Sequence, residues 1–280
     1  KKINMKIMVI GAKGSLGSEI CKQLNKQEIP FLPITRNELD INTNIDILEK
    51  FILSSQSNVI INCIALLGIE NCKENTQQAL EINSLFPNKL FLIAKRNNLS
   101  FIQISTECIF SCDDINLFNF ENDNPNPNTT YGLTKRLGEC YPSKNFHLVR
   151  LPLLFGNSNN RQIISKLTEI ALDDQEIKVS NDIITTPVYT PDVASWIIKN
   201  ILDNFKKFPE IVHLNSSERI SMYDFMVKIL SHFDKEKYVI SVSSDFFPSS
   251  EPKPKFGGLS SNHHNGFDLD QMINSYVKSI

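Results

Sequence analysis

Short apolar runs alternate with amphipathic segments along the first half of the chain. Runs of strand length occupy residues 6–10, 59–65, 101–105 and 147–151, and a weaker run with two prolines occupies 29–35. Apolar residues recur at helical spacing in 15–25, 45–53 and 79–97. This alternation predicts βαβ units and a parallel sheet. The near-continuous apolar character of the strands predicts that helices cover both faces of that sheet.

The second half of the chain has a looser pattern. Residues 111–130 are rich in Asn, Pro and acids and are predicted to form a loop, and so are residues 248–258. Helices are expected at 161–172, 191–204 and 221–233. The predicted fold is α/β: a Rossmann-type doubly wound parallel sheet with a smaller C-terminal α/β substrate-binding part. We place the NAD(P)-binding domain at 1–155 and the substrate-binding part at 156–280, with some segments of the latter returning to the first domain.

Composition excludes several classes of protein. The chain has 280 residues, 41% hydrophobic and 21% charged, with a net charge of −2 and no basic run. Nothing therefore indicates a nucleic-acid or membrane partner, and the first apolar run is too short for a secretory signal or a membrane span. The six cysteines form no CxxC pair and no zinc spacing, so we expect reduced thiols, no metal site and a cytoplasmic protein.

A glycine triplet follows the first predicted strand. Gly11, Gly14 and Gly17 have the spacing G-x-x-G-x-x-G and open the first predicted helix. Glycines let the backbone turn tightly and approach a diphosphate, and the helix N-terminus offers free N–H groups and the positive end of a dipole. In this strand–turn–helix context the triplet predicts a dinucleotide site rather than a tight turn made only for packing.

The end of the second predicted strand bears on cofactor choice. The usual acid is absent from the strand end and Arg36 stands there instead. An arginine in this place can hold a 2′-phosphate, which favours NADP and leaves NAD as the alternative. Asp40 and Ile41 are candidate adenine contacts.

A tyrosine and a lysine four residues apart form the candidate catalytic pair. Tyr131 and Lys135 would share one face of a helix. A nearby ammonium favours the phenolate, so Lys135 is expected to lower the pKa of Tyr131 and let it exchange a proton with a carbonyl oxygen. Ser105 and Thr106 end the fourth predicted strand, where ligands gather in open α/β sheets.

Three segments carry a family resemblance. Residues 10–17 (IGAKGSLG), 104–110 (ISTECIF) and 130–139 (TYGLTKRLGE) resemble the extended short-chain dehydrogenases and, more narrowly, the dTDP-4-dehydrorhamnose reductases. The resemblance implies an NAD(P)H-dependent reductase of a nucleotide-linked 4-keto sugar. It also implies roles for individual residues. The cofactor diphosphate would be bound by Gly11, Gly14, Ser15, Leu16 and Gly17, and the cofactor would be lined by Ala65 and Leu66. Thr106 would hydrogen-bond the keto oxygen, Tyr131 would donate the proton, and Lys135 would hold the nicotinamide ribose.

Departures from the family pattern leave alternatives open. Glu107 and Cys108 replace the usual Asp and Tyr of the family block, and Lys253-Pro254 replaces an Arg-Pro. These changes leave the sugar unidentified. Glu107 is an acid beside the candidate catalytic threonine, so a nucleotide-sugar epimerase or dehydratase is the second candidate function. A non-catalytic regulatory subunit similar to the methionine adenosyltransferase beta subunit is the third candidate. A homodimer is left open, because the surface beside the tyrosine has no distinctive sequence mark.

Overall fold

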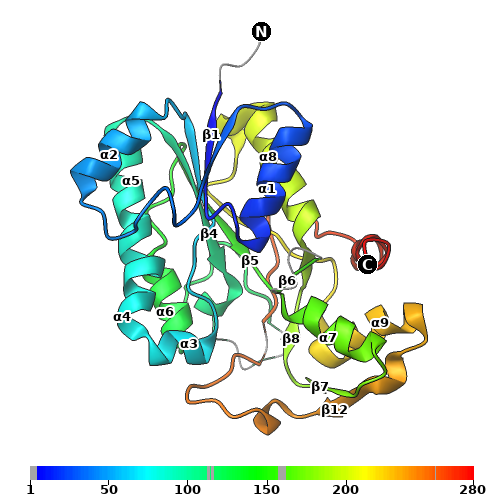
Figure 1. Cartoon of the computed structure of the whole chain (residues 1–280). Helices are drawn as coiled ribbons and strands as arrows, with labels where there is room; N and C mark the ends of the chain where they lie inside the picture. The colour runs from blue at the N-terminus through cyan, green and yellow to red at the C-terminus, as the bar shows by residue number, and fades with distance from the viewer. Residues whose placement is uncertain (1–4, 112–113, 115–116, 157–161, 256) are drawn as a thin grey trace.

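Six parallel strands form the central sheet of the computed structural model, which describes residues 5–111, 114, 117–156, 162–255 and 257–280. The strand order is β10-β5-β4-β3-β1-β2, with every neighbouring pair parallel (Figure 1). Pro33 is compatible with β2 because β2 is an edge strand. The strands are β1 (Ile7–Ile10), β2 (Phe31–Ile34), β3 (Val59–Asn62), β4 (Ser100–Thr106), β5 (Phe146–Leu151) and β10 (Ile211–His213).

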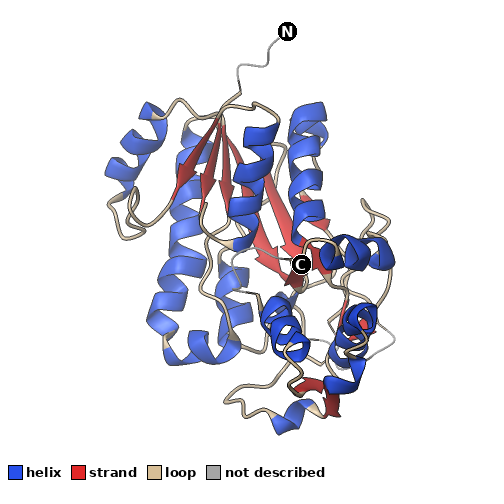
Figure 2. Cartoon of the chain, turned by 45° about the vertical axis from the view of Figure 1, so that its right-hand side comes forward, coloured by secondary structure: helices blue, strands red, loops and turns tan. Residues whose placement is uncertain are grey.

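Helices cover both faces of this sheet, as predicted, and bury an apolar core on each (Figure 2). On one face α1 (Ser15–Lys26) packs beside α8 (Thr190–Asn204). On the other face α2 (Ile45–Ser54) packs beside α5 (Phe86–Arg96). Since helices lie on the two faces, the carboxyl edge of the sheet is left for a ligand.

The predicted helix at 79–97 is interrupted. It consists of α4 (Thr76–Leu80), a π-helical turn η1 (Glu81–Leu85) and α5. Pro87 has no N–H and cannot donate to the carbonyl of Asn83 four residues earlier, which explains why α-helical bonding fails here. Two short elements of this half were not predicted: α3 (Ile69–Glu74) and the 3-10 helix η2 (Glu107–Ile109). The helix expected to carry Tyr131 and Lys135 is α6 (Thr130–Leu137), which begins at the last residue of the predicted loop 111–130.

The C-terminal part is built from small strand pairs. These are β6 (Leu154–Phe155) with β9 (Val188–Tyr189), β7 (Ile177–Ser180) with β12 (Val239–Val242), and β8 (Ile184–Thr185) with β11 (Ile220–Ser221). Strands of two to four residues are too short to show a period in the sequence, so none was predicted. The helices of this part are α7 (Ile163–Leu172), α9 (Met222–Leu230) and α10 (Leu269–Val277), and the remaining 3-10 turns are η3 (Phe205–Lys207), η4 (Ser231–Phe233), η5 (Glu236–Tyr238) and η6 (Ser244–Phe246).

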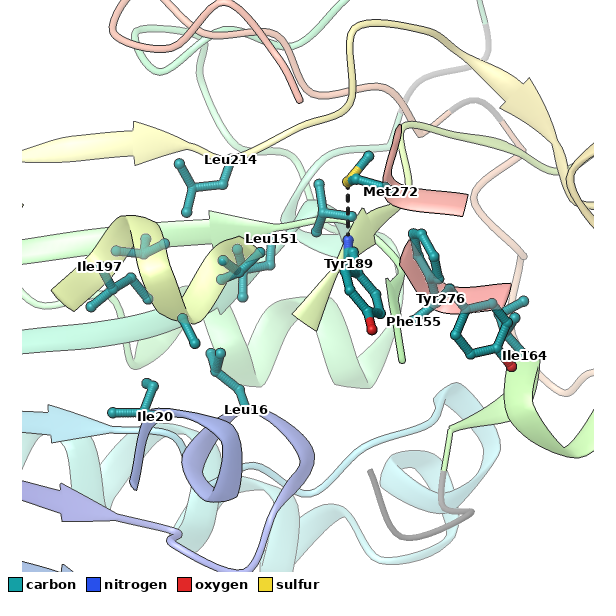
Figure 3. Packing of buried hydrophobic residues seen from close by; sticks show 14 of the residues in the cluster. Leu16, Ile20, Leu151, Phe155, Ile164, Tyr189, Ile197, Leu214, Met272 and Tyr276 are labelled. Atoms are coloured by element: carbon teal, nitrogen blue, oxygen red, sulfur yellow. Dashed lines mark hydrogen bonds between the residues drawn. The ribbon is translucent and has the colours of Figure 1, made fainter. Parts of the chain in front are cut away.

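Two segments beyond residue 156 return to the Rossmann part, α8 on its face and β10 in its sheet. One continuous core joins the two parts (Figure 3). In it, Phe155 lies within 5.4 Å of the ring of Tyr189 and 5.6 Å of the ring of Tyr276, measured between centroids. The division at 155/156 stays a prediction. Across the described ranges, no helix is both long enough and apolar enough to span a bilayer.

Candidate active site

The predicted site residues gather at the carboxyl edge of three adjacent strands. Gly11 follows β1, Ala65 follows β3 and Thr106 ends β4, and these strands are neighbours in the order β4-β3-β1. A methyl group added to Gly11 would lie 3.1 Å from the backbone of Cys63, so the loops after β1 and β3 touch. The structure thus brings the glycine loop and the β3 loop to the same edge as Thr106.

The glycine loop has the geometry of a diphosphate cradle. Gly11 has a φ of +87°, which favours glycine, and a Cβ on Gly17 would lie 2.3 Å from the carbonyl oxygen of Gly11. Gly14 is the N-cap of α1 and makes no side-chain cap. The N-terminus of α1, at Ser15 and Leu16, therefore keeps its N–H groups and dipole available for an anion. These residues fit a dinucleotide.

The turn after β2 contains an acid, Glu38, four residues beyond the end of the strand. Arg36 is exposed there, as are Asp40 and Glu38, and Ile41 is half-buried. The carboxylate of Glu38 accepts hydrogen bonds from the backbone N and Oγ1 of Thr35 at 2.7 and 2.6 Å. These hydrogen bonds lower the pKa of Glu38, with a smaller contribution from Lys13. Two opposite charges thus lie near the place expected for the adenosine ribose.

Asn83, in the π-helical turn, holds the β3 loop against the tyrosine helix. Its side chain accepts from the backbone N of Leu66 at 2.9 Å and donates to the carbonyl of Leu66 at 3.0 Å and to Oγ1 of Thr134 at 3.2 Å. The side chain is fully buried. Sequence reasoning missed Asn83, because its partners lie 17 and 51 positions away.

The side chain of Thr106 acts on the phenol of Tyr131: hydrogen bonding from Thr106 favours a lower phenol pKa. Oγ1 of Thr106 also accepts from the backbone N of Cys108 at 3.2 Å. That bond occupies an acceptor position on Oγ1, so the hydroxyl proton stays available to another oxygen. Tyr131 stands in the first turn of α6, where Oγ1 of Thr129 caps the N–H of Gly132 at 3.0 Å.

The pKa of Tyr131 differs from the expectation. Burial raises the pKa of Tyr131 far above its usual value, and the Thr106 hydrogen bond only partly offsets it. Lys135 is buried too, and burial lowers its pKa to about 8, although Glu139 acts in the opposite direction. The ammonium donates to the carbonyl of Ile104 at 2.7 Å. In the free protein burial therefore has a larger effect on the phenol than the lysine does.

Two glycines set the position of α6. A Cβ on Gly132 would lie 2.1 Å from the carbonyl oxygen of Cys108, and one on Gly138 would lie 1.9 Å from that of Asn83. Because both clashes are with backbone, neither position accepts a larger residue without movement of the helix. At its far end α6 is followed by Glu139, which makes a buried bidentate ion pair with Arg150 of β5 at 2.9 Å.

Glu107, next to Thr106, reaches toward the C-terminal part. Its carboxylate accepts from Oγ1 of Thr185 at 3.0 and 3.1 Å. Burial raises the pKa of Glu107 to about 7, against the effect of these hydrogen bonds. Lys253, which stands where the family has arginine, donates to the carbonyls of Ser244 (2.7 Å) and Phe247.

Among the described side chains, no group of three or more His, Cys, Asp or Glu could hold a metal ion. Five cysteines are described, and all five are free thiols; Cys112 lies outside the described residues.

Comparison with known proteins agrees with this geometry. The spore coat polysaccharide biosynthesis protein SpsK of Bacillus subtilis is 27% identical over 91% of this chain and 89% of its own. The dTDP-4-dehydrorhamnose reductase of Mycolicibacterium smegmatis is 25% identical over 91% and 78%. The crystal structure of a dTDP-4-dehydrorhamnose reductase from Clostridium acetobutylicum has 29% identity and a TM-score of 0.89, covering 98% of this chain and 99% of its own.

The family model described as the RmlD substrate binding domain matches residues 5–272. This match spans the glycine loop, the Thr106 segment, the tyrosine helix and most of the C-terminal part. The chain therefore belongs to the RmlD substrate binding domain family.

Proposed function

We propose that this protein is an NAD(P)H-dependent oxidoreductase that reduces the 4-keto group of a dTDP-linked deoxy sugar. The observation that carries the proposal is the placement of Thr106 beside Tyr131, whose pKa it acts to lower, with Lys135 on the same helix and the glycine cradle on the same sheet edge. Relatives that align along about nine-tenths of the chain are named as reductases of dTDP-linked 4-keto sugars. These names agree with the chemistry of the three side chains.

A bound reduced nicotinamide would supply the hydride for the keto carbon. Tyr131 would then give its phenolic proton to the keto oxygen, so that the C=O bond becomes CH–OH and the phenol becomes phenolate. The Thr106 hydroxyl would donate a second hydrogen bond to the same oxygen. The raised pKa of Tyr131 keeps the phenol protonated, as a proton donor requires. The ammonium of Lys135 would stabilise the phenolate that remains.

The preferred cofactor would be NADPH. Arg36 is exposed at the end of β2 and free to approach a 2′-phosphate. Glu38 on the same turn is held by Thr35, which directs its carboxylate toward the protein backbone. A dTDP-4-dehydrorhamnose reductase from Bacillus anthracis with the same fold, at 23% identity and a TM-score of 0.90, is in complex with NADP.

A dehydratase would need the acid at Glu107 as a catalyst. Instead, the Glu107 carboxylate accepts hydrogen bonds from Thr185, and a Cβ on Gly257 would lie 2.7 Å from it. These contacts support a structural role for Glu107, which joins the two parts of the molecule. They favour the reductase.

We further propose that two copies associate and that the protein works in the cytoplasm. The neighbouring elements η1, α5 and α6 expose Leu85, Leu92, Leu133 and Leu137, and this apolar face suits a second copy. The five free thiols are typical of a reducing compartment. The mass of the purified protein by light scattering, compared between the wild type and Leu133→Glu, tests the pairing.

The function is tested with purified protein and a panel of nucleotide-linked keto sugars. We expect NADPH oxidation with dTDP-linked 4-keto-6-deoxy sugars and one reduced sugar formed for each NADPH consumed. Product formation without net NADPH consumption would support the epimerase or dehydratase. Absence of both turnover and NADPH binding would favour a non-catalytic regulatory subunit.

A further inference from the structure

The carboxylate of Glu251 lies at the N-terminus of the tyrosine helix. The backbone N of Thr130 donates to its two oxygens at 2.9 and 3.1 Å, and Oγ1 of Thr130 donates at 2.6 Å. Only 11% of the Glu251 side chain is exposed, and Nζ of Lys73 lies 3.7 Å from it. A residue 121 positions along the chain therefore completes the start of the helix that carries Tyr131.

The first turn of a helix needs such partners. Its first N–H groups have no acceptor within the helix, and a carboxylate there is also stabilised by the helix dipole. In α6, Thr129 satisfies the N–H of Gly132 and Glu251 satisfies that of Thr130. Tyr131 lies between these two capped positions, so the two caps restrict the backbone on both sides of the proton donor.

The segment that contains Glu251 is also attached to a second element. Glu70 of α3 accepts from the hydroxyl of Ser249 and from the backbone N and hydroxyl of Ser250, all at 2.7–2.8 Å. In Figure 1 this part of the tail passes beside α3. The Glu70 contacts hold the tail to α3, whereas Glu251 holds it to α6 and, through the 3.7 Å ion pair with Lys73, to α3 as well. The chain thus offers a matched control for Glu251.

We propose that Glu251 is a positioning residue for the reaction: through Thr130 it holds Tyr131 opposite Thr106. The proposal rests on the proposed function, in which Tyr131 donates the proton. Because Gly132 and Gly138 leave α6 no room beside Cys108 and Asn83, loosening its first turn moves the phenol instead of repacking the helix. A misplacement of about 1 Å can reduce the rate of a proton transfer about 100-fold.

The experiment compares Glu251→Ala with Glu70→Ala in the full chain. Four quantities are measured for each: kcat and KM for the keto sugar, the Kd of NADPH, and hydrogen exchange of the amides of 129–133. We expect Glu251→Ala to lower kcat about tenfold to 100-fold, with KM and Kd within about twofold, and to speed exchange in 129–133. Glu70→Ala is expected to leave kcat and this exchange unchanged.

Milder variants cover the case in which Glu251→Ala does not fold. Glu251→Gln keeps one acceptor oxygen, and Thr130→Val removes only the hydroxyl contact, so both are expected to show smaller losses of the same kind. Equal losses of kcat in Glu251→Ala and Glu70→Ala would overturn the proposal, because they would show that attachment of the whole tail segment matters and the cap on α6 does not. Unchanged kcat and unchanged exchange in Glu251→Ala would also overturn it.

Failure of the proposed function gives a different result. In that case the wild type turns over no keto sugar, and the exchange comparison decides alone. Faster exchange at 129–133 in Glu251→Ala but not in Glu70→Ala supports Glu251 as the residue that fixes Tyr131, and equal exchange contradicts it.

Discussion

The side chain of Thr106, at the end of β4, acts by hydrogen bonding to lower the pKa of the phenol of Tyr131, in the first turn of α6. Two hydroxyl groups placed in this way can both donate to one keto oxygen. Their relative placement depends on the close approach of α6 to η2, where Gly132 faces the carbonyl of Cys108. The proposed chemistry therefore depends on how α6 is held.

Reduction is expected to slow as pH rises through about 8. Burial lowers the pKa of Lys135 to about 8, so the ammonium is present below that pH and lost above it, while Tyr131 keeps its proton throughout. We expect kcat/KM for the keto sugar, which reports the free enzyme, to be level below pH 7 and to fall above pH 8. In Lys135→Arg the guanidinium stays charged, so the rate is lower but the fall near pH 8 disappears. If kcat/KM of Lys135→Arg still falls near pH 8, the fall is caused by the titration of another group.

Cofactor preference is expected to depend on Arg36. Removal of its guanidinium in Arg36→Ala should weaken NADPH binding about tenfold and leave NADH binding within about twofold, since only NADPH carries the 2′-phosphate. Glu38→Gln is the control at the same turn and should leave NADPH binding equal or tighter. The measurement is a fluorescence titration with each reduced nicotinamide. If Arg36→Ala weakens the binding of NADPH and NADH equally, Arg36 does not bind the 2′-phosphate.

Much of this site could be predicted from local sequence, because local patterns determine strands and turns. The glycine loop, Thr106 and the Tyr131–Lys135 pair each belong to a short motif, and the sheet places all of them at one edge. Asn83 and Glu251 could not be predicted. They act on residues 17 to 121 positions away, and no periodicity reports a contact at that range. The raised pKa of Tyr131 depends on burial by the folded chain, which a spacing does not reveal.

Gly132→Ala is expected to destabilise the protein. The added Cβ would lie 2.1 Å from the carbonyl oxygen of Cys108. The clash can be relieved only if the backbone of α6 or of η2 moves. We expect a loss of about 1–3 kcal/mol in the free energy of unfolding, although alanine is the better helix former. Thermal unfolding and kcat are measured together. At Gly156 an added Cβ meets only side-chain atoms at 3.3 Å or more, so Gly156→Ala should cost less; an equal cost would contradict the account.

Glu107→Gln is expected to change how stability depends on pH. Because the folded-state pKa of Glu107 is raised to about 7, its protonated form stabilises the fold below the unfolded pKa, and this contribution is lost as pH rises through about 7. Glutamine keeps an acceptor for Thr185 and does not ionise. The variant should therefore gain stability relative to the wild type between pH 5 and pH 8, by on the order of 1–3 kcal/mol. The free energy of unfolding is measured by denaturant titration of both proteins at pH 5 and pH 8. The same difference between the two proteins at both pH values would refute this.

In the proposed reaction Tyr131 gives the proton when a nucleotide-linked keto sugar is reduced. The most direct test compares steady-state NADPH oxidation by the wild type and by Tyr131→Phe, with the Kd of NADPH determined for both. We expect a kcat about 10²–10⁴-fold lower in Tyr131→Phe and a Kd within about twofold. Equal kcat values for the two proteins would show that Tyr131 is not the proton donor.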